Sequence, residues 1–135
     1  REEIKGYNEG LQAFLGSGAC PENGTADLTL SIKTLSAYTL EHEIKRIDFL
    51  KIDTEGHDLK VLLGATNDFH VIKFIQYEHW GIHNNKMIIG LLQDDFEIKD
   101  IGYRNMFCMN KKLVSEEERV RLKTYIEDNK LCELV

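Results

Sequence analysis

Residues 47–65 constrain the fold more than any other stretch, because they read as a buried strand that runs directly into an amphipathic helix. The strand ends at Asp53 and Glu55. A second apolar run, at 71–80, repeats this plan and ends in Glu78, His79 and Trp80. In open α/β sheets, ligands bind outside the carboxyl ends of the strands. The two runs therefore predict one polar crevice at a shared sheet edge.

The order of the remaining elements predicts an α/β fold with a mostly parallel sheet, helices on both faces and a carboxyl-terminal antiparallel hairpin. We expect a half-buried strand at 28–33, a helix at 35–45, and buried strands at 47–53 and 71–78 that flank a crossover helix. A helix capped by Asn84 or Asn85 is expected next, and then strands at 96–103 and 106–110 joined by Arg104 and Asn105. The last element is a helix at 115–135, opened by a Ser115–Glu118 capping box. The side chains expected to face inward on the helices are Leu35, Tyr38, Leu40, Leu59, Leu62, Leu63, Met87, Ile88, Leu91, Leu92, Leu122, Tyr125 and Ile126.

Size and charge limit the classes of function. A chain of 135 residues is one domain at most, 1–135. Its net charge of −6 argues against nucleic-acid binding, which needs clustered Lys and Arg. No apolar run is long enough to span a membrane. Three widely spaced cysteines, Cys20, Cys108 and Cys132, fit buried reduced thiols in a cytoplasmic protein better than a disulfide framework.

The first of these strands and its helix resemble a known family. The residues that carry the resemblance are Asp48, Phe49, Leu50, Lys51, Ile52, Asp53, Glu55, Gly56, Leu62, Gly64 and Ala65. They resemble the FkbM family of S-adenosylmethionine-dependent methyltransferases, in which a strand of this pattern runs into a helix ending near Leu-x-Gly-Ala. A looser likeness at 18–25 resembles the family's turn ahead of a strand.

The resemblance implies a Rossmann-like class I methyltransferase sheet, S-adenosylmethionine as the cofactor and a hydroxyl of a sugar, glycan or related natural product as the methyl acceptor. It places Gly18 and Ala19 near the adenine. A strand followed by a Gly-rich donor-binding turn is missing before residue 25, so we read the chain as the carboxyl-terminal portion of such a domain. We expect a missing half to leave an apolar face that favours association with that half or with another copy.

Proton transfer to a positioned base assists methyl transfer to a hydroxyl. His79 is the expected base, because imidazole titrates near neutral pH and Glu78 or Asp53 can orient it. Asp53 and Glu55 complete the expected catalytic group. Glu78, Trp80 and Gly56 are the expected substrate-binding residues.

Three alternatives stay open. Asp53 can simply cap the following helix, as strand-end carboxylates often do. Asp53, Glu55, Glu78 and His79 contain the ligand types of a divalent-metal enzyme, although their spacing matches no closed zinc pattern and we assign no metal. The chain can also be a non-catalytic remnant that keeps the sheet and has lost donor binding.

Overall fold

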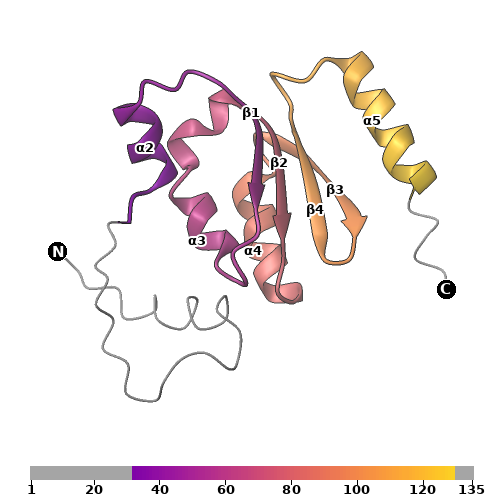
Figure 1. The fold of residues 1–135 in the computed structure, drawn as a ribbon. Coiled ribbons are helices and arrows are strands. Elements are labelled where there is room, and N and C mark those ends of the chain that lie inside the picture. The colour runs from indigo at the N-terminus through magenta and orange to yellow at the C-terminus, as the bar shows by residue number, and fades with distance from the viewer. Residues whose placement is uncertain (1–31, 130–135) are drawn as a thin grey trace. The chain divides into compact units, whose positions relative to one another are not determined.

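The fold was obtained as a computed structural model that describes residues 32–129 (Figure 1). All elements discussed below lie in the compact unit Lys33–Val135. The strand expected at 28–33 falls outside the described residues apart from its last two positions, which form no regular element. Cys20, Cys132 and the proposed adenine contacts Gly18 and Ala19 also lie outside them.

The elements follow the expected order along the chain. They are α2 (Leu35–Glu41), β1 (Ile47–Ile52), α3 (Asp58–Leu63), the 3₁₀ helix η1 (Thr66–Val71), β2 (Ile72–Glu78), α4 (Ile82–Leu92), β3 (Phe96–Gly102), β4 (Asn105–Asn110) and α5 (Glu116–Asn129). η1 was not expected, and α2 ends four residues before the predicted limit of its helix.

The four strands form one sheet in the order β1-β2-β4-β3. β1 and β2 pair in parallel, whereas β4 pairs antiparallel with both β2 and β3. β1, β2 and β3 therefore run in one direction and β4 runs against them. The expected hairpin is present, but its last strand lies inside the sheet and β3 forms the edge. Three of these four strands run in the same direction, as the prediction of a mostly parallel sheet requires. Only one of the three strand pairings between them is parallel, so the prediction is wrong for the pairings.

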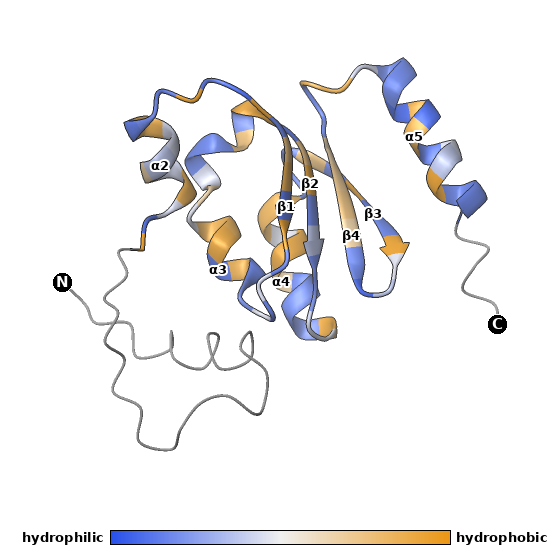
Figure 2. Cartoon of the chain, viewed as in Figure 1, coloured by the Kyte–Doolittle hydropathy of each residue, from blue (hydrophilic) through white to orange (hydrophobic). Residues whose placement is uncertain are grey.

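One face of the sheet forms the core, because residues two apart on a strand point to the same face. In the register of the sheet, this face carries Leu50, Ile52, Ile75, Tyr77, Met106 and Cys108. Leu62 of α3 and Ile88 and Leu92 of α4 pack against it and are fully buried. Each such aliphatic side chain contributes roughly 1.5–3 kcal/mol through burial. In Figure 1, α4 lies behind the strands and α3 lies beside β1, and the apolar residues of both helices appear orange in Figure 2.

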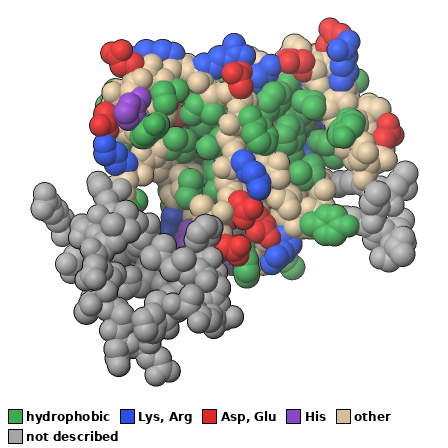
Figure 3. Space-filling view, viewed as in Figure 1, with side chains coloured by type: hydrophobic (Ala, Val, Ile, Leu, Met, Phe, Trp, Pro, Cys, Tyr) green, Lys and Arg blue, Asp and Glu red, His purple; other side chains and the backbone are tan. Residues whose placement is uncertain are grey.

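The opposite face is covered only in part. Phe49, Phe74 and Phe107 form an aromatic row across three strands, with ring centroids 5.6 Å apart for Phe74 and Phe107 and 6.5 Å apart for Phe49 and Phe107. Phe49 is 50% exposed. Figure 3 shows hydrophobic side chains gathered on the side of the molecule that faces the viewer. The expectation that β1 is buried on both faces is therefore wrong within the described residues.

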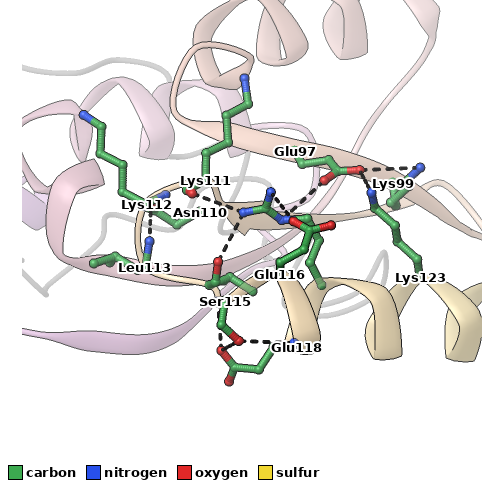
Figure 4. Close-up of polar contacts among 12 residues, drawn as sticks. Glu97, Lys99, Asn110, Lys111, Lys112, Leu113, Ser115, Glu116, Glu118 and Lys123 are labelled. Carbon is green, nitrogen blue, oxygen red and sulfur yellow. Dashed lines mark hydrogen bonds and ion pairs between the residues drawn. The ribbon is translucent and has the colours of Figure 1, made fainter.

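Helix α5 is held at β3 by charge as well as by apolar contact. Glu97 Oε1 lies 2.8 Å from Lys123 Nζ and 3.7 Å from Lys99 Nζ (Figure 4). A cavity of about 280 Å³ lies between α5 and the strands and is lined by Ile101, Phe107, Leu122, Tyr125, Ile126 and Asn129. The inward direction predicted for Leu122 and Ile126 is confirmed, whereas Tyr125 is largely exposed.

Several predicted core positions on the other helices are wrong. Tyr38 and Leu40 of α2, Leu63 of α3 and Met87 of α4 are exposed. The buried residue of α2 is Thr39, whose hydroxyl donates to the Asp68 carboxylate at 2.6 Å. A polar contact thus fixes α2 where the sequence pattern suggested an apolar stripe.

The turn chemistry matches the prediction at one place, is shifted by one residue at a second and differs at a third. Ser115 and Glu118 form the predicted capping box, with Glu118 N donating to Ser115 Oγ and Ser115 N to the Glu118 carboxylate. The hairpin turns at Tyr103 and Arg104, one residue earlier than predicted, and both have positive φ, as a two-residue type I′ turn requires. Asn84 and Asn85 do not cap α4, because they lie inside it and Gly81 occupies the cap position.

Asn110 offers a test of how β4 is tied to its surroundings. It is buried, its amide nitrogen donates to the carbonyls of Phe69 and Ile72, and its amide oxygen accepts from the backbone of Lys112 and Leu113. Asn110→Ala leaves these four backbone groups without their partner. We expect it to lower the free energy of unfolding by about 2–3 kcal/mol in urea denaturation.

The control for this measurement is Asn67→Ala, at an exposed position. We expect it to change the free energy of unfolding by less than about 0.5 kcal/mol. Equal effects of the two substitutions would contradict the structural role assigned to Asn110.

Candidate functional site

The polar ends of β1 and β2 meet at one edge of the sheet. The parallel register pairs Ile52 with Tyr77, so the residues that follow each strand emerge side by side. β4 begins at the same edge, because Asn105 pairs with Glu78. The hairpin turn before Asn105 therefore belongs to this edge as well. We call the set formed by residues 53–58, 78–81 and 103–105 the carboxyl edge.

The loop after β1 turns sharply. β1 ends at Ile52, and the His57 backbone N–H donates to the Thr54 carbonyl at 3.2 Å. Glu55 and Gly56 both have positive φ, of 52° and 94°. Glycine adopts this conformation readily, but for Glu55 it costs roughly 1–2 kcal/mol. The strand does not continue through Glu55, so Asp53 and Glu55 do not share a face in the way that a strand would provide.

Asp53 does not cap the following helix. Its carboxylate accepts from Lys51 Nζ at 3.1 Å, and α3 begins five residues later with His57 at its cap position and no side-chain cap hydrogen bond. The side chain of Asp53 is 46% exposed. The capping alternative for Asp53 is therefore wrong.

Asp58 is the most buried ionisable group of the carboxyl edge, with 1% of its surface exposed. Its Oδ1 accepts from the Thr54 backbone N–H at 3.1 Å and from the Thr54 hydroxyl at 2.9 Å. Its Oδ2 is buried and has no hydrogen-bond partner within the described residues. Burial raises the pKa of Asp58 above its ordinary value of 3.8, the Thr54 hydrogen bonds oppose the shift, and the charges of Asp53 and Glu78 add to it. The charges of Asp53 and Glu78 therefore favour the protonated form of Asp58.

Glu78 is paired with a residue that the sequence analysis did not select. Arg104 Nη2 lies 2.9 Å from Glu78 Oε1, and the same guanidinium lies 4.8 Å from the ring centroid of Trp80. A Cβ placed on Gly56 would contact the Trp80 indole at 3.7 Å, so the loop after β1 packs beside this ring. The Trp80 ring thus lies beside Gly56 of the loop after β1 and makes a cation–π contact with Arg104 of the hairpin turn.

His79 is held by its backbone. Its N–H donates to the Arg104 carbonyl at 2.9 Å, which continues the β2–β4 pairing by one residue. Its Nδ1 is buried and finds no hydrogen-bond partner in residues 32–129. The expectation that Glu78 or Asp53 orients the imidazole is not met, because Glu78 pairs with Arg104 and Asp53 with Lys51.

The structure thus brings Asp53, Glu55, Gly56, Glu78, His79 and Trp80 to one edge. It adds Asp58 and Arg104, which the sequence analysis missed. Asp58 had a usable signal, because it precedes the buried Leu62 by four residues and therefore places an acid on the inner stripe of α3. The sequence gives no comparable signal for Arg104, because the position of its side chain depends on which two residues form the hairpin turn.

Within residues 32–129, no group of three or more His, Cys, Asp or Glu side chains is arranged to hold a metal ion. The described part of the chain gives the metal alternative no support. No helix in that part is long and apolar enough to cross a bilayer.

Comparison with protein families decides the affiliation of the chain. A family model described as the methyltransferase FkbM domain matches residues 6–104. The chain belongs to the FkbM methyltransferase family. A search of curated proteins and a search of solved structures each returned no significant match.

The FkbM match contains the whole carboxyl edge except Asn105. It ends at Arg104, the residue that pairs with Glu78. The whole of β4 and the whole of α5 follow the matched region. The resemblance on residues 48–65 is therefore confirmed, and the match extends it toward both ends.

The pKa of Asp58 predicts a pH dependence of stability. Because the folded chain binds this proton more tightly than the unfolded chain, the contribution of Asp58 to the free energy of unfolding is largest below pH 3.8 and falls as the pH rises through the raised folded pKa. Asp58→Asn removes this titration. We expect the stability of the variant relative to the unmodified chain to increase from below pH 3.8 to neutral pH, as measured by urea denaturation. A difference that stays constant with pH would contradict the assignment.

Proposed function

We propose that the chain is part of an S-adenosylmethionine-dependent O-methyltransferase that acts on a hydroxyl of a sugar, a glycan or a related natural product. The observation that carries this proposal is the FkbM family match, which includes both polar strand ends. The sheet supports it as well. Three strands that run one way, with the antiparallel β4 between two of them, fit the carboxyl-terminal half of a Rossmann-like sheet.

The charge of the carboxyl edge suits this donor. Asp53, Glu55 and Glu78 supply carboxylates there, and within residues 32–129 Lys51 pairs with Asp53 and Arg104 with Glu78. A sulfonium is positively charged, so it is attracted to such an edge. When bound, S-adenosylmethionine supplies an activated methyl group. We propose that Gly18 and Ala19, outside the described residues, contact its adenine.

We assign His79 the role of proton acceptor. As the acceptor oxygen forms its bond to the methyl carbon, its hydroxyl proton must pass to a base. Because His79 Nδ1 is buried and unpartnered, Nε2 is the nitrogen proposed to take this proton. Such a base contributes roughly 10²- to 10⁴-fold. The backbone hydrogen bond from His79 N to Arg104 O, 2.9 Å long, holds the main chain of His79 in place while the proton moves.

The remaining side chains are proposed to hold the acceptor. Asp53 and Glu55 are exposed enough to accept hydrogen bonds from sugar hydroxyls. Trp80 offers an amphipathic surface beside Gly56, and Glu78 positions the Arg104 guanidinium against that ring. Correct alignment of the acceptor oxygen supplies much of the acceleration, roughly 7–11 kcal/mol in well-oriented intramolecular cases.

The test separates donor binding from catalysis. In the complete enzyme of which this chain is proposed to be part, titration of S-adenosylmethionine and of its demethylated product by calorimetry is expected to show saturable binding. His79→Ala is expected to keep this binding and to lower kcat for a hydroxyl acceptor by roughly 10²- to 10⁴-fold.

His70→Ala is the matched control, because His70 is exposed and precedes the opposite end of β2. We expect it to leave kcat unchanged. Full turnover in His79→Ala would remove His79 from the mechanism. Failure of the unmodified protein to bind donor or product would favour the non-catalytic reading.

A further inference from the structure

We propose that Asp58 is a positioning residue that fixes the loop after β1, and through it the acidic side chains of the carboxyl edge, by clamping Thr54. The inference deepens the proposed methyl transfer and rests on it for its catalytic consequence. Its structural part concerns the chain alone.

The clamp connects two ends of one short loop. Asp58 is the first residue of α3, and Thr54 is the second residue after β1. The carboxylate of Asp58 reaches back and accepts both the N–H and the hydroxyl of Thr54. Because these bonds point toward the preceding loop, Asp58 does not use its carboxylate to satisfy the first amides of its own helix. Ordinary helix capping therefore does not explain its position.

The loop requires such a clamp because its backbone is strained. Glu55 lies in the left-handed region without being glycine, and Gly56 follows it in the same region. A conformation of this kind persists only where the surroundings hold it. Within the loop, the bond from His57 N to Thr54 O is long, at 3.2 Å. The two bonds from Thr54 to Asp58 fix the residue that accepts this bond.

The clamp is maintained against an energetic penalty. Burying a carboxylate with one oxygen that lacks a hydrogen bond lowers the stability of the fold unless its other contacts compensate. Burial and the nearby charges of Asp53 and Glu78 both oppose its ionisation. An apolar residue at position 58 would pack on Leu62 without this penalty. The acid is therefore explained by the loop it holds and not by the core it enters.

A second buried aspartate provides a matched control. Asp68 of η1 is also buried, and its carboxylate accepts from the hydroxyls of Ser36 and Thr39. It lies before β2, at the opposite edge of the sheet from the loop. Removing Asp68 tests what the loss of a buried, hydrogen-bonded carboxylate does to the fold in general.

The primary measurement is amide hydrogen exchange in the full chain without donor. In Asp58→Ala, the His57 amide is expected to exchange at least about ten-fold faster relative to the amide of Ile75 in β2. In Asp68→Ala, this ratio is expected not to rise, because a fall in overall stability speeds exchange at the core amide of Ile75 at least as much as at the loop amide of His57. An unchanged ratio in Asp58→Ala, or the same change in both variants, would overturn the proposal.

Thr54→Val keeps the backbone N–H and removes only the hydroxyl, so it serves if Asp58→Ala does not fold. It is expected to accelerate exchange at His57 by less than Asp58→Ala does, whereas Thr54→Ser, which keeps the hydroxyl, is expected to restore the exchange rate of the unmodified chain. Equal exchange rates at His57 in Thr54→Val and Thr54→Ser would contradict the clamp.

Catalysis supplies a separate readout. Asp58→Ala is expected to lower kcat by about ten- to a hundred-fold, with little change in the KM for the donor, because the loop is displaced and not removed. Asp68→Ala is expected to change neither constant. If the unmodified protein transfers no methyl group while exchange at His57 still depends on Asp58, the proposed function fails and the clamp stands. If methyl transfer proceeds but is indifferent to Asp58, the positioning role is wrong.

Discussion

The parallel pairing of β1 with β2 is the interaction on which the rest of the structure depends. The core side chains Ile52, Ile75 and Tyr77 fix its register, because a slip by one residue would turn each of them to the opposite face. The same register makes the two polar loops leave the sheet next to each other. Hydrophobic burial at the centre of the sheet therefore determines which charged groups meet at its edge.

The charge distribution at this edge follows from the pairing partners that the sheet provides. β4 enters beside β2 and brings Arg104 to Glu78, which leaves His79 without the carboxylate that sequence spacing suggested for it. Lys51 has the same effect on Asp53. Within residues 32–129, the buried Asp58 has no ion pair, and Thr54 holds its carboxylate through hydrogen bonds. The edge thus combines two ion-paired acids at its surface with a buried acid held by hydrogen bonds.

Much of the fold could be predicted because the amino-acid composition of the strands identifies them in the sequence. The run at 47–52 contains four large apolar residues and is followed by Asp53, so both its existence and its end could be predicted. Helix faces were less readable. Thr39 is buried through a hydroxyl contact with Asp68, which lies 29 positions along the chain, and no local pattern reveals such a partner. Met87 and Leu63 follow the helical period but lie at the margin of the stripe, where exposure depends on the neighbouring element.

The candidate site, like the fold, could be predicted only in part. The residues at the strand ends were predictable, since parallel strands place their carboxyl ends at one edge. Their partners were not, because ion pairs depend on side-chain reach and on the position of a turn. Asp58 shows where sequence analysis can be extended: an acid four residues before a fully buried leucine breaks the expected apolar stripe of a crossover helix.

The turn at Tyr103 and Arg104 has a consequence for how this family can vary. Two residues with positive φ make the tightest connection between β3 and β4, and neither of them is glycine. Lengthening this connection by one residue would move the guanidinium away from both the acid and the indole while leaving the strands paired. Loop length at the hairpin is therefore a means by which relatives could alter the electrostatics of the edge without altering the sheet.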